Sequence, residues 1–181
     1  MTALDSAPDG ILAERAADGD TAAFTVLVRR HGPFLRAFAA RLTGSMADAD
    51  DCVQEALITA WSRLPELQDP QRVRAWLTTI VSRKATDRLR SRPASESIDG
   101  LELEASEPSP ERQAIASSQL DALKVALAAL TPEQRAVWVL KEVGGDSYEE
   151  IAEQLEVPVA TVRGRLSRAR AAVLKSMEEW R

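Results

Sequence analysis

The sequence is poor in the side chains on which most catalytic and metal sites depend. Among its 181 residues there is one cysteine, Cys52, and one histidine, His31. A single cysteine cannot form an internal disulfide or a cysteine-based zinc site, and a single histidine excludes the two-histidine metal motifs. The same scarcity argues against most hydrolytic triads. We expect Cys52 to be a small core residue and His31 to lie at the surface or at a boundary.

Glycine and aromatic residues are also scarce, and no long apolar run is present. There are eight glycines, and aromatic residues make up 4% of the chain, whereas alanine, leucine, arginine and glutamate are abundant. This balance favours helices, so the expected fold class is all-α. The N-terminus has neither a basic start nor an apolar stretch, and no later stretch approaches bilayer length. We therefore expect a cytoplasmic protein with no membrane insertion.

Hydrophobic periodicity predicts a first helical domain, a bundle over residues 11–92, after a disordered tail over residues 1–10. Asp20 is placed to cap a helix that Gly32-Pro33 then breaks or kinks. The next helix starts near Ser45, and its apolar positions recur at Val53, Leu57, Trp61 and Leu64. A last helix, from about residue 71, ends in five cations: Arg83, Lys84, Arg88, Arg90 and Arg92.

The composition changes sharply over residues 93–113. Between Pro93 and Glu111 there are six acidic residues, three prolines and no lysine or arginine. The apolar area of this segment is too small to offset the entropy of ordering it. We predict a flexible acidic linker here, followed by a second small helical domain over residues 114–181.

The second domain is predicted to contain a helix-turn-helix. Ser147 and Glu150 open a short helix with capping-box spacing, and Val157-Pro158 separates it from a second helix. This second helix has a stripe of apolar residues at helical spacing, Val162, Leu166, Ala169 and Val173. In a helix-turn-helix one helix packs behind while the second presents its outer face to DNA.

The outer face of that second helix carries arginines without acidic residues, although the net charge of the chain is −5. Between Val159 and Lys175 there are five basic residues and no acidic one. Solvated helices usually mix both signs of charge, and arginine contacts phosphates or guanine edges. We therefore interpret this helix as DNA-reading rather than as a plain charged surface. Its outer residues are Thr161, Arg163, Gly164, Arg165, Ser167, Arg168 and Arg170.

Three segments in this order resemble the extracytoplasmic-function sigma factors, a two-domain group of the sigma-70 family. DADDCVQEALITAW resembles their polymerase-binding helix, and VRAWLTTIVSRKATDRLRSR resembles the helix that opens and reads the −10 element. SYEEIAEQLEVPVATVRGRLSRARAAV resembles the helix-turn-helix that reads the −35 element. The resemblance covers about residues 11–92 and 115–177. It implies a promoter-specificity subunit that binds RNA polymerase core, recognises both elements and promotes DNA opening.

The resemblance also implies roles for individual positions. The residues that would dock on the clamp helices of the polymerase's largest subunit are Asp51, Gln54 and Glu55. Those at the −10 element would be Asp69, in a loop that holds a flipped base, and Arg83, Lys84 and Arg88. The −35 bases would be read by Arg163, Gly164, Ser167 and Arg168, with Arg165 and Arg170 on phosphates. The acidic linker would run towards the active-site and RNA-exit channels, and an anti-sigma factor is expected as a further partner.

Two positions depart from the family pattern. Glu156 stands where the turn usually has glycine, so it needs a left-handed or adjusted conformation at a modest cost. Lys84 stands where the family often has asparagine, which leaves its individual contact open. Plainer interpretations also remain open elsewhere: Trp61 and Trp76 suit a core better than a wedge in DNA, and Asp51 and its neighbours suit an ordinary solvated face. The cations near residue 90 could merely complement the end of their helix.

Other function classes predict different behaviour. A helix-turn-helix repressor or activator that works without polymerase would bind palindromic DNA tightly on its own. An adaptor that only imitates a sigma factor would lose DNA binding, and the arginines at 163–170 argue against it. No phosphate-binding glycine loop, metal set or nucleophile–base pair is evident. We therefore expect no enzyme, no catalytic residues, no metal and no cofactor.

Overall fold

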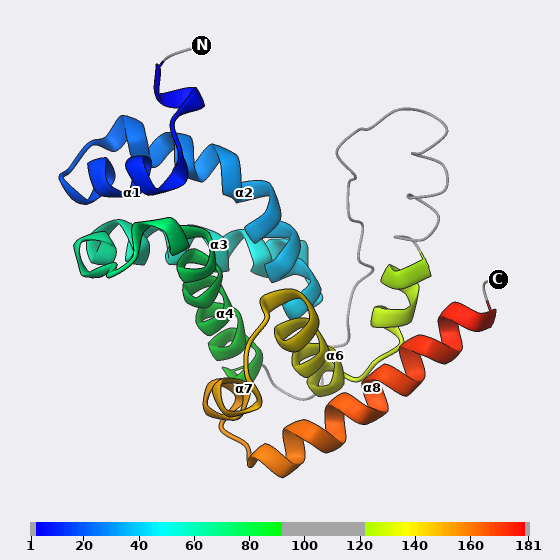
Figure 1. The fold of residues 1–181 in the computed structure, drawn as a ribbon. Coiled ribbons are helices and arrows are strands. Elements are labelled where there is room, and N and C mark those ends of the chain that lie inside the picture. The colour runs from blue at the N-terminus through cyan, green and yellow to red at the C-terminus, as the bar shows by residue number, and fades with distance from the viewer. Residues whose placement is uncertain (1–2, 92–121, 180–181) are drawn as a thin grey trace, which may run out of the picture.

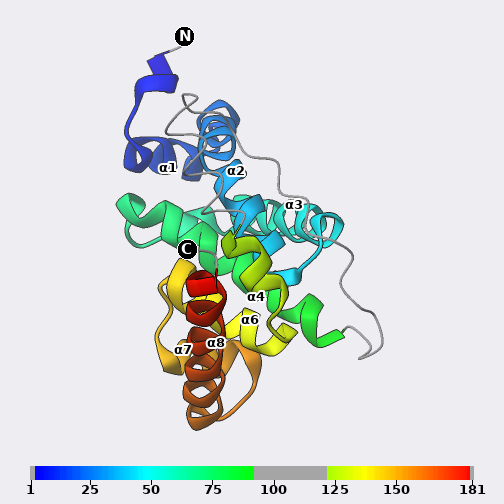
Figure 2. The same ribbon diagram turned by 90° about the vertical axis from the view of Figure 1, so that its right-hand side faces the viewer.

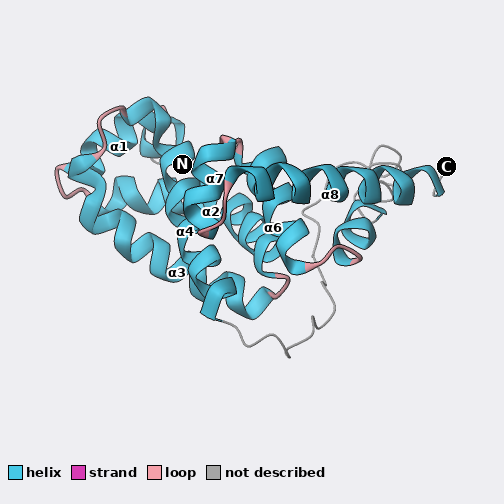
Figure 3. Cartoon of the chain, turned by 90° about the horizontal axis from the view of Figure 1, so that it is seen from below, coloured by secondary structure: helices cyan, strands magenta, loops and turns pink. Residues whose placement is uncertain are grey.

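The computed structural model describes residues 3–91 and 122–179, and this part of the chain consists of helices joined by short loops, with no strand (Figures 1 and 3). The all-α fold class is confirmed. The predicted linker at 93–113 lies outside the described residues. No helix in the described ranges is both long and apolar enough to cross a bilayer.

The first half is a bundle of four α-helices with short 3-10 turns. Its elements are η1 (Ala3–Ser6), α1 (Asp9–Ala17), α2 (Thr21–Thr43), α3 (Met46–Arg63), η2 (Leu64–Glu66), η3 (Pro70–Arg72) and α4 (Val73–Ser91). Asp20 caps α2 as predicted, because its carboxylate accepts from the backbone N–H groups of Ala22 and Ala23. Gly44 ends α2 in the left-handed conformation, with φ 73°.

The N-terminus differs from the prediction of a disordered tail, because it is tied to α2 by ion pairs. Asp5 pairs with Arg29, and Asp9 pairs with Arg30. Asp9 also lies 2.8 Å from His31 Nε2, and His31 is only 7% exposed. The prediction that His31 lies at the surface or a boundary was wrong, because His31 is buried where it meets Asp9.

One further expectation for the bundle is narrowed and one needs correction. Of the predicted break or kink at Gly32-Pro33, the break is excluded, because α2 is continuous over Thr21–Thr43 and the side chains on either side of the proline, Leu27 and Leu35, are fully buried. The buried face of α3 is the row Ala49, Cys52, Ala56 and Ala60, not the bulky stripe that the sequence suggested. Small side chains let neighbouring helices approach α3 closely, while the larger stripe, apart from Leu64, is only partly buried.

The second half contains the predicted helix-turn-helix. After a helix over residues 122–128 come α6 (Pro132–Val139), a π-helical turn η4 (Leu140–Gly144), α7 (Tyr148–Leu155) and α8 (Val159–Glu179). The Ser147–Glu150 capping box is confirmed, with both reciprocal hydrogen bonds present. Glu156 has φ 54°, which confirms that the turn places a non-glycine residue in the left-handed region.

The two halves pack against each other. α6 and η4 lie against α2, and α7 lies against the lower end of α4 as drawn in Figure 1. One apolar cluster contains core residues of both halves, including Phe38 and Ala85 from the first and Val137 and Ile151 from the second. Cys52 belongs to this cluster, as predicted. Burial raises the pKa of its thiol to about 11. α8 packs on α6 and α7 and extends away from the first half in Figure 1, and it is seen nearly end-on in Figure 2.

Candidate nucleic-acid and polymerase interfaces

The predicted −35 residues lie along one side of α8 because its apolar stripe faces the core. Val162, Leu166 and Ala169 are buried with at most 1% exposure. Four of the predicted contacts are exposed, namely Arg163, Ser167, Arg168 and Arg170. The other three are partly buried, namely Thr161, Gly164 and Arg165. The helix therefore presents the cationic outer face that a DNA-reading helix requires.

Two arginines of α8 are held by neighbouring helices. The guanidinium of Arg163 lies 5.5 Å from the centre of the Tyr148 ring, which orients it by a cation–π contact. Arg170 donates two hydrogen bonds to Glu142 Oε1, at 2.8 and 2.6 Å, and this pairing raises the pKa of Arg170. The resemblance implied that Arg170 contacts a phosphate. In this structure its guanidinium is instead paired with Glu142 of the same chain.

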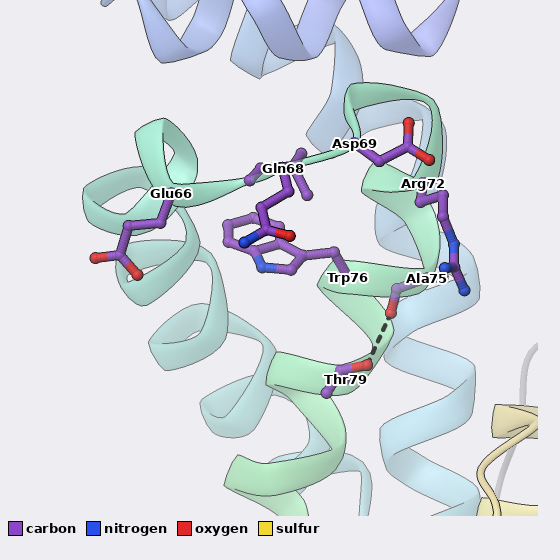
Figure 4. A pocket seen from close by; sticks show the side chains of 8 residues that line it. Glu66, Gln68, Asp69, Arg72, Ala75, Trp76 and Thr79 are labelled. Atoms are coloured by element: carbon purple, nitrogen blue, oxygen red, sulfur yellow. Dashed lines mark hydrogen bonds between the residues drawn. The ribbon is translucent and has the colours of Figure 1, made fainter.

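A pocket of about 400 Å³ lies where the loop after α3 meets the start of α4. Figure 4 shows Asp69 and Arg72 on the rim and Trp76 along the wall. The complete lining is Glu66, Leu67, Gln68, Asp69, Arg72, Ala75, Trp76 and Thr79. The carboxylate of Asp69 accepts a 3.0 Å hydrogen bond from the N–H of Gln71, which caps η3 and fixes the carboxylate at the rim. This volume falls within the range of about 300–1,000 Å³ that is usual for ligand pockets.

The lining of this pocket contains three residues that we did not single out from the sequence, Arg72, Ala75 and Thr79. Together with Trp76, they follow the i, i+3, i+4, i+7 spacing of one helical face. Trp76 is half-buried, so it serves the core and the pocket wall together. The helical spacing of these residues is evident in the sequence. Periodicity alone does not show that the loop after α3 covers this face of the helix.

The predicted polymerase residues lie on the exposed side of α3. Gln54 is exposed, and Ile58 one turn further is 66% exposed. Asp51 and Glu55 are also exposed but are paired with predicted −10 residues of α4. Arg88 Nη2 lies 3.2 Å from Asp51, and Lys84 Nζ lies 3.5 Å from Glu55.

Arg88 bridges two carboxylates of α3. It also lies 2.8 Å from the largely buried Asp48, and this hydrogen bond raises the pKa of Arg88. Arg83, the remaining predicted −10 cation, is exposed and lies near Asp146 of the second half. The described residues contain no group of acidic, histidine and cysteine side chains suited to a metal ion.

Comparison with known proteins identifies the family. Residues 27–94 match the sigma-70 region 2 model, and residues 120–173 match the sigma-70 region 4 model. RNA polymerase sigma factor CnrH of Cupriavidus metallidurans is 38% identical over 90% of this chain and 91% of its own length. The chain belongs to the extracytoplasmic-function sigma factors of the sigma-70 family. The ECF RNA polymerase sigma-E factor of Escherichia coli is 32% identical over 91% of this sigma factor and 92% of its own length.

Solved structures of the family share the fold. CnrH in complex with the cytosolic domain of CnrY has a TM-score of 0.56 at 34% identity, covering 94% of this sigma factor and 97% of that chain. The sigma factor RpoE of Bartonella quintana, in complex with the anti-sigma factor NepR, has a TM-score of 0.59 at 27% identity, covering 86% and 96%. This sigma factor is a promoter-recognition subunit of RNA polymerase, and it binds the polymerase core and promoter DNA. The polymerase-independent alternative is not favoured.

Proposed function

We propose that this sigma factor docks on the polymerase clamp through α3 and reads two promoter elements with its two halves. The exposed side of α3, with Asp51, Gln54 and Glu55, provides the polar docking surface. The outer face of α8 reads the −35 bases, and Arg163 and Arg168 supply the cations for guanine edges and phosphates. The cationic face of α8 is the observation that carries this assignment.

The pocket at the start of α4 accepts a base flipped out of the −10 element. Its half-buried indole, Trp76, offers a stacking surface, and the rim offers the carboxylate of Asp69 and the guanidinium of Arg72. Stacking on an aromatic side chain and hydrogen bonding at the base edge are the usual means of holding an extruded base. Arg83, Lys84 and Arg88 then follow the single strand along α4, which favours strand opening.

Binding to polymerase explains how a protein with a net charge of −5 can select a promoter. Tethering two weak DNA contacts to one polymerase raises their effective concentration. On this proposal the protein acts in the cytoplasm, consumes no substrate and is held inactive by an anti-sigma factor. The complexes of the relatives CnrH and RpoE with CnrY and with the anti-sigma factor NepR support the existence of such a partner.

A core-dependent run-off transcription assay tests the proposal, together with a direct measurement of core binding. Arg163→Glu and Arg168→Glu should lose transcript from the cognate promoter while retaining core affinity. Gln54→Arg should lose core affinity. Gln54 suits this test because changing it leaves the ion pairs of Asp51 and Glu55 with α4 in place. The proposal would be refuted if the wild-type protein yielded no transcript and did not bind core. It would also be refuted if the protein bound a palindromic operator tightly without polymerase.

A further inference from the structure

The N-terminal helix α1 packs against the loop that carries the proposed base pocket. Its neighbours there are η2 and η3, the two short turns between α3 and α4. Gly10, in the first turn of α1, is buried, and the side-chain amide of Gln71 in η3 lies against it. Gln71 stands in the sequence between residues of the pocket lining, although it is not itself part of that lining. The contact between α1 and η3 is therefore next to the pocket.

Position 10 has room for glycine alone while Gln71 keeps this place. A Cβ on Gly10 would lie 2.7 Å from Cδ of Gln71 and 3.0 Å from its Oε1, with Nε2 nearer still. Carbon atoms in contact are about 3.5–4.0 Å apart, so the amide would have to move by about 1 Å. Glycine weakens a helix relative to alanine, and one of its uses is to let another segment approach the backbone closely. At Gly10 the approaching group is the amide of Gln71.

The backbone of Gln71 is joined to the rim of the pocket. Its N–H donates to the carboxylate of Asp69 at 3.0 Å, and the N–H of Arg72 donates to the backbone oxygen of Asp69, also at 3.0 Å. Residues three apart in a 3-10 turn lie on the same side. Asp69 and Arg72 therefore lie together on the pocket, while Gln71 between them contacts α1. A shift of Gln71 would carry both rim residues with it.

α1 is itself fixed to the bundle on both sides of its first turn. Leu12 is fully buried in the core. The carboxylate of Asp9, directly before Gly10, pairs with Arg30 of α2 and lies 2.8 Å from His31 Nε2. Contacts thus run without interruption from α2 through α1 and Gln71 to the rim of the pocket.

We propose that Gly10 and Gln71 are positioning residues for the base extruded from the −10 element. They hold Asp69 and Arg72 at the place, relative to Trp76, from which the pocket distinguishes one base from another. Neither residue touches the base, because both act through the rim. The inference rests on the proposed function of the pocket, and it makes α1 a determinant of promoter selectivity.

The plainer interpretation is that Gln71 only rests on α1. Gln71 is exposed as a whole, so on this interpretation its amide moves into solvent without effect when residue 10 gains a side chain. Its contact with buried backbone and the hydrogen bond from its N–H to Asp69 favour a supporting role instead. The two interpretations differ in what they predict for base selectivity.

Gly10→Ala tests the inference in polymerase holoenzyme. Competition binding to forked promoter fragments, with each of the four bases at each −10 position, measures the discrimination. It should fall at least about fivefold at the position of the extruded base, the effect of losing a well-aligned contact to a base edge. Core affinity and discrimination within the −35 element should not change. Gly32→Ala is the matched control, because it makes the same change inside α2 where no neighbouring atom lies within 4 Å, and it should leave all three unchanged.

Gln71→Ala is a second variant, which decides the test if Gly10→Ala does not fold. It should lower discrimination at the same position by a similar factor. The double variant should lose no more than either single variant, since both changes remove one contact. Unchanged discrimination in Gln71→Ala or in folded Gly10→Ala, or additive losses in the double variant, would overturn the positioning role. A wild-type holoenzyme that binds all four bases equally at every −10 position would instead overturn the base pocket of the proposed function.

Discussion

On the proposed function, Arg163 is the side chain that should affect base choice more than overall affinity. It is exposed on the first turns of α8, and the Tyr148 ring restricts the directions in which its guanidinium points. An oriented guanidinium can donate two parallel hydrogen bonds to guanine, and these distinguish one base pair from the others. Lys175, on the same helix, is exposed but lies three turns further along.

We expect Arg163→Ala to relax specificity at one base pair of the −35 element. The loss should be about 1–3 kcal/mol of discrimination at that position and little elsewhere. Competition binding of the polymerase holoenzyme to a set of single-substitution promoters measures it. Lys175→Ala is the control, because it removes the same charge and should weaken all promoters alike. Equal weakening by both variants across the whole set would count against base reading by Arg163.

The titration of Asp146 should change the free energy of unfolding of the protein. Burial raises the pKa of its carboxyl above 3.8, against the hydrogen bond from Gln154. Glu150 also raises this pKa, whereas Lys141 and Arg83 lower it. A raised pKa means that the native state binds this proton more tightly than the unfolded chain. Ionisation of Asp146 therefore lowers the free energy of unfolding as the pH rises from about 3.8 through the native pKa.

Asp146→Asn should remove that cost. The free energy of unfolding of the variant, relative to wild type, should increase as the pH rises through this window and then remain constant. Urea titrations at a series of pH values measure the difference. Glu149→Gln, at a neighbouring exposed carboxylate, is the control for loss of charge. A difference between Asp146→Asn and wild type that does not vary with pH would contradict the assignment.

The sequence could predict which residues face outward but not which of them pair. The exposure of Arg163, Arg168 and Gln54 follows from the spacing of apolar residues on their own helices. The pairs Arg170–Glu142 and Lys84–Glu55 join different helices, so they depend on how those helices pack. Local periodicity carries no information on that packing.

At the scale of elements, α7 is a short helix whose start is fixed by its cap. It has only eight residues, and isolated helices of that length are unstable in water. The Ser147 hydroxyl accepts from the N–H of Glu150, and the Glu150 carboxylate accepts from the N–H of Ser147 at 2.7 Å. These two bonds satisfy backbone donors that would otherwise be lost at the first turn.

Ser147→Ala should destabilise the protein by about 1 kcal/mol, because it removes the cap of α7. Ser147→Asp should retain most of the stability, since aspartate caps helices as well as serine does. Thermal unfolding of the two variants beside wild type tests this. Equal melting temperatures for Ser147→Ala and wild type would show that packing alone holds α7.

Elements with a local signal could be predicted, and those fixed by distant contacts could not. The caps at Asp20 and Ser147 depend on residues within one turn, and the structure has both. The helical order of the N-terminus depends on Asp5 and Asp9 meeting α2, more than twenty residues away. The face that α3 buries depends on how closely α2 and α4 approach, which favours alanine at Ala56 over larger side chains.

At the scale of the whole molecule, the two halves share one core. Phe38 contributes to it from the first half, and its ring lies 3.5 Å from the position that a Cβ on Gly144 of the second half would take. A shared core couples the unfolding of the elements that form it. We therefore expect amides in α2 and α6 to be protected from hydrogen exchange by similar free energies in the free protein.

Phe38→Ala should test this coupling. Loss of a fully buried phenylalanine costs about 3–5 kcal/mol, and protection should fall in α6 and α7 as well as in α2. Ile11→Ala changes an apolar residue that is already 46% exposed, so it should change protection little. Reduced protection confined to α2 and its neighbours in the first half would show that the halves unfold independently.

The placement of Cys52 has a consequence for how the protein meets oxidants. Its side chain is only 4% exposed and, with a thiol pKa of about 11, stays protonated at neutral pH. Peroxide attacks thiolates, so the intact fold should withstand air and peroxide without forming linked dimers. The folded chain therefore offers oxidants no reactive thiol, and Cys52 becomes reactive only when the fold opens.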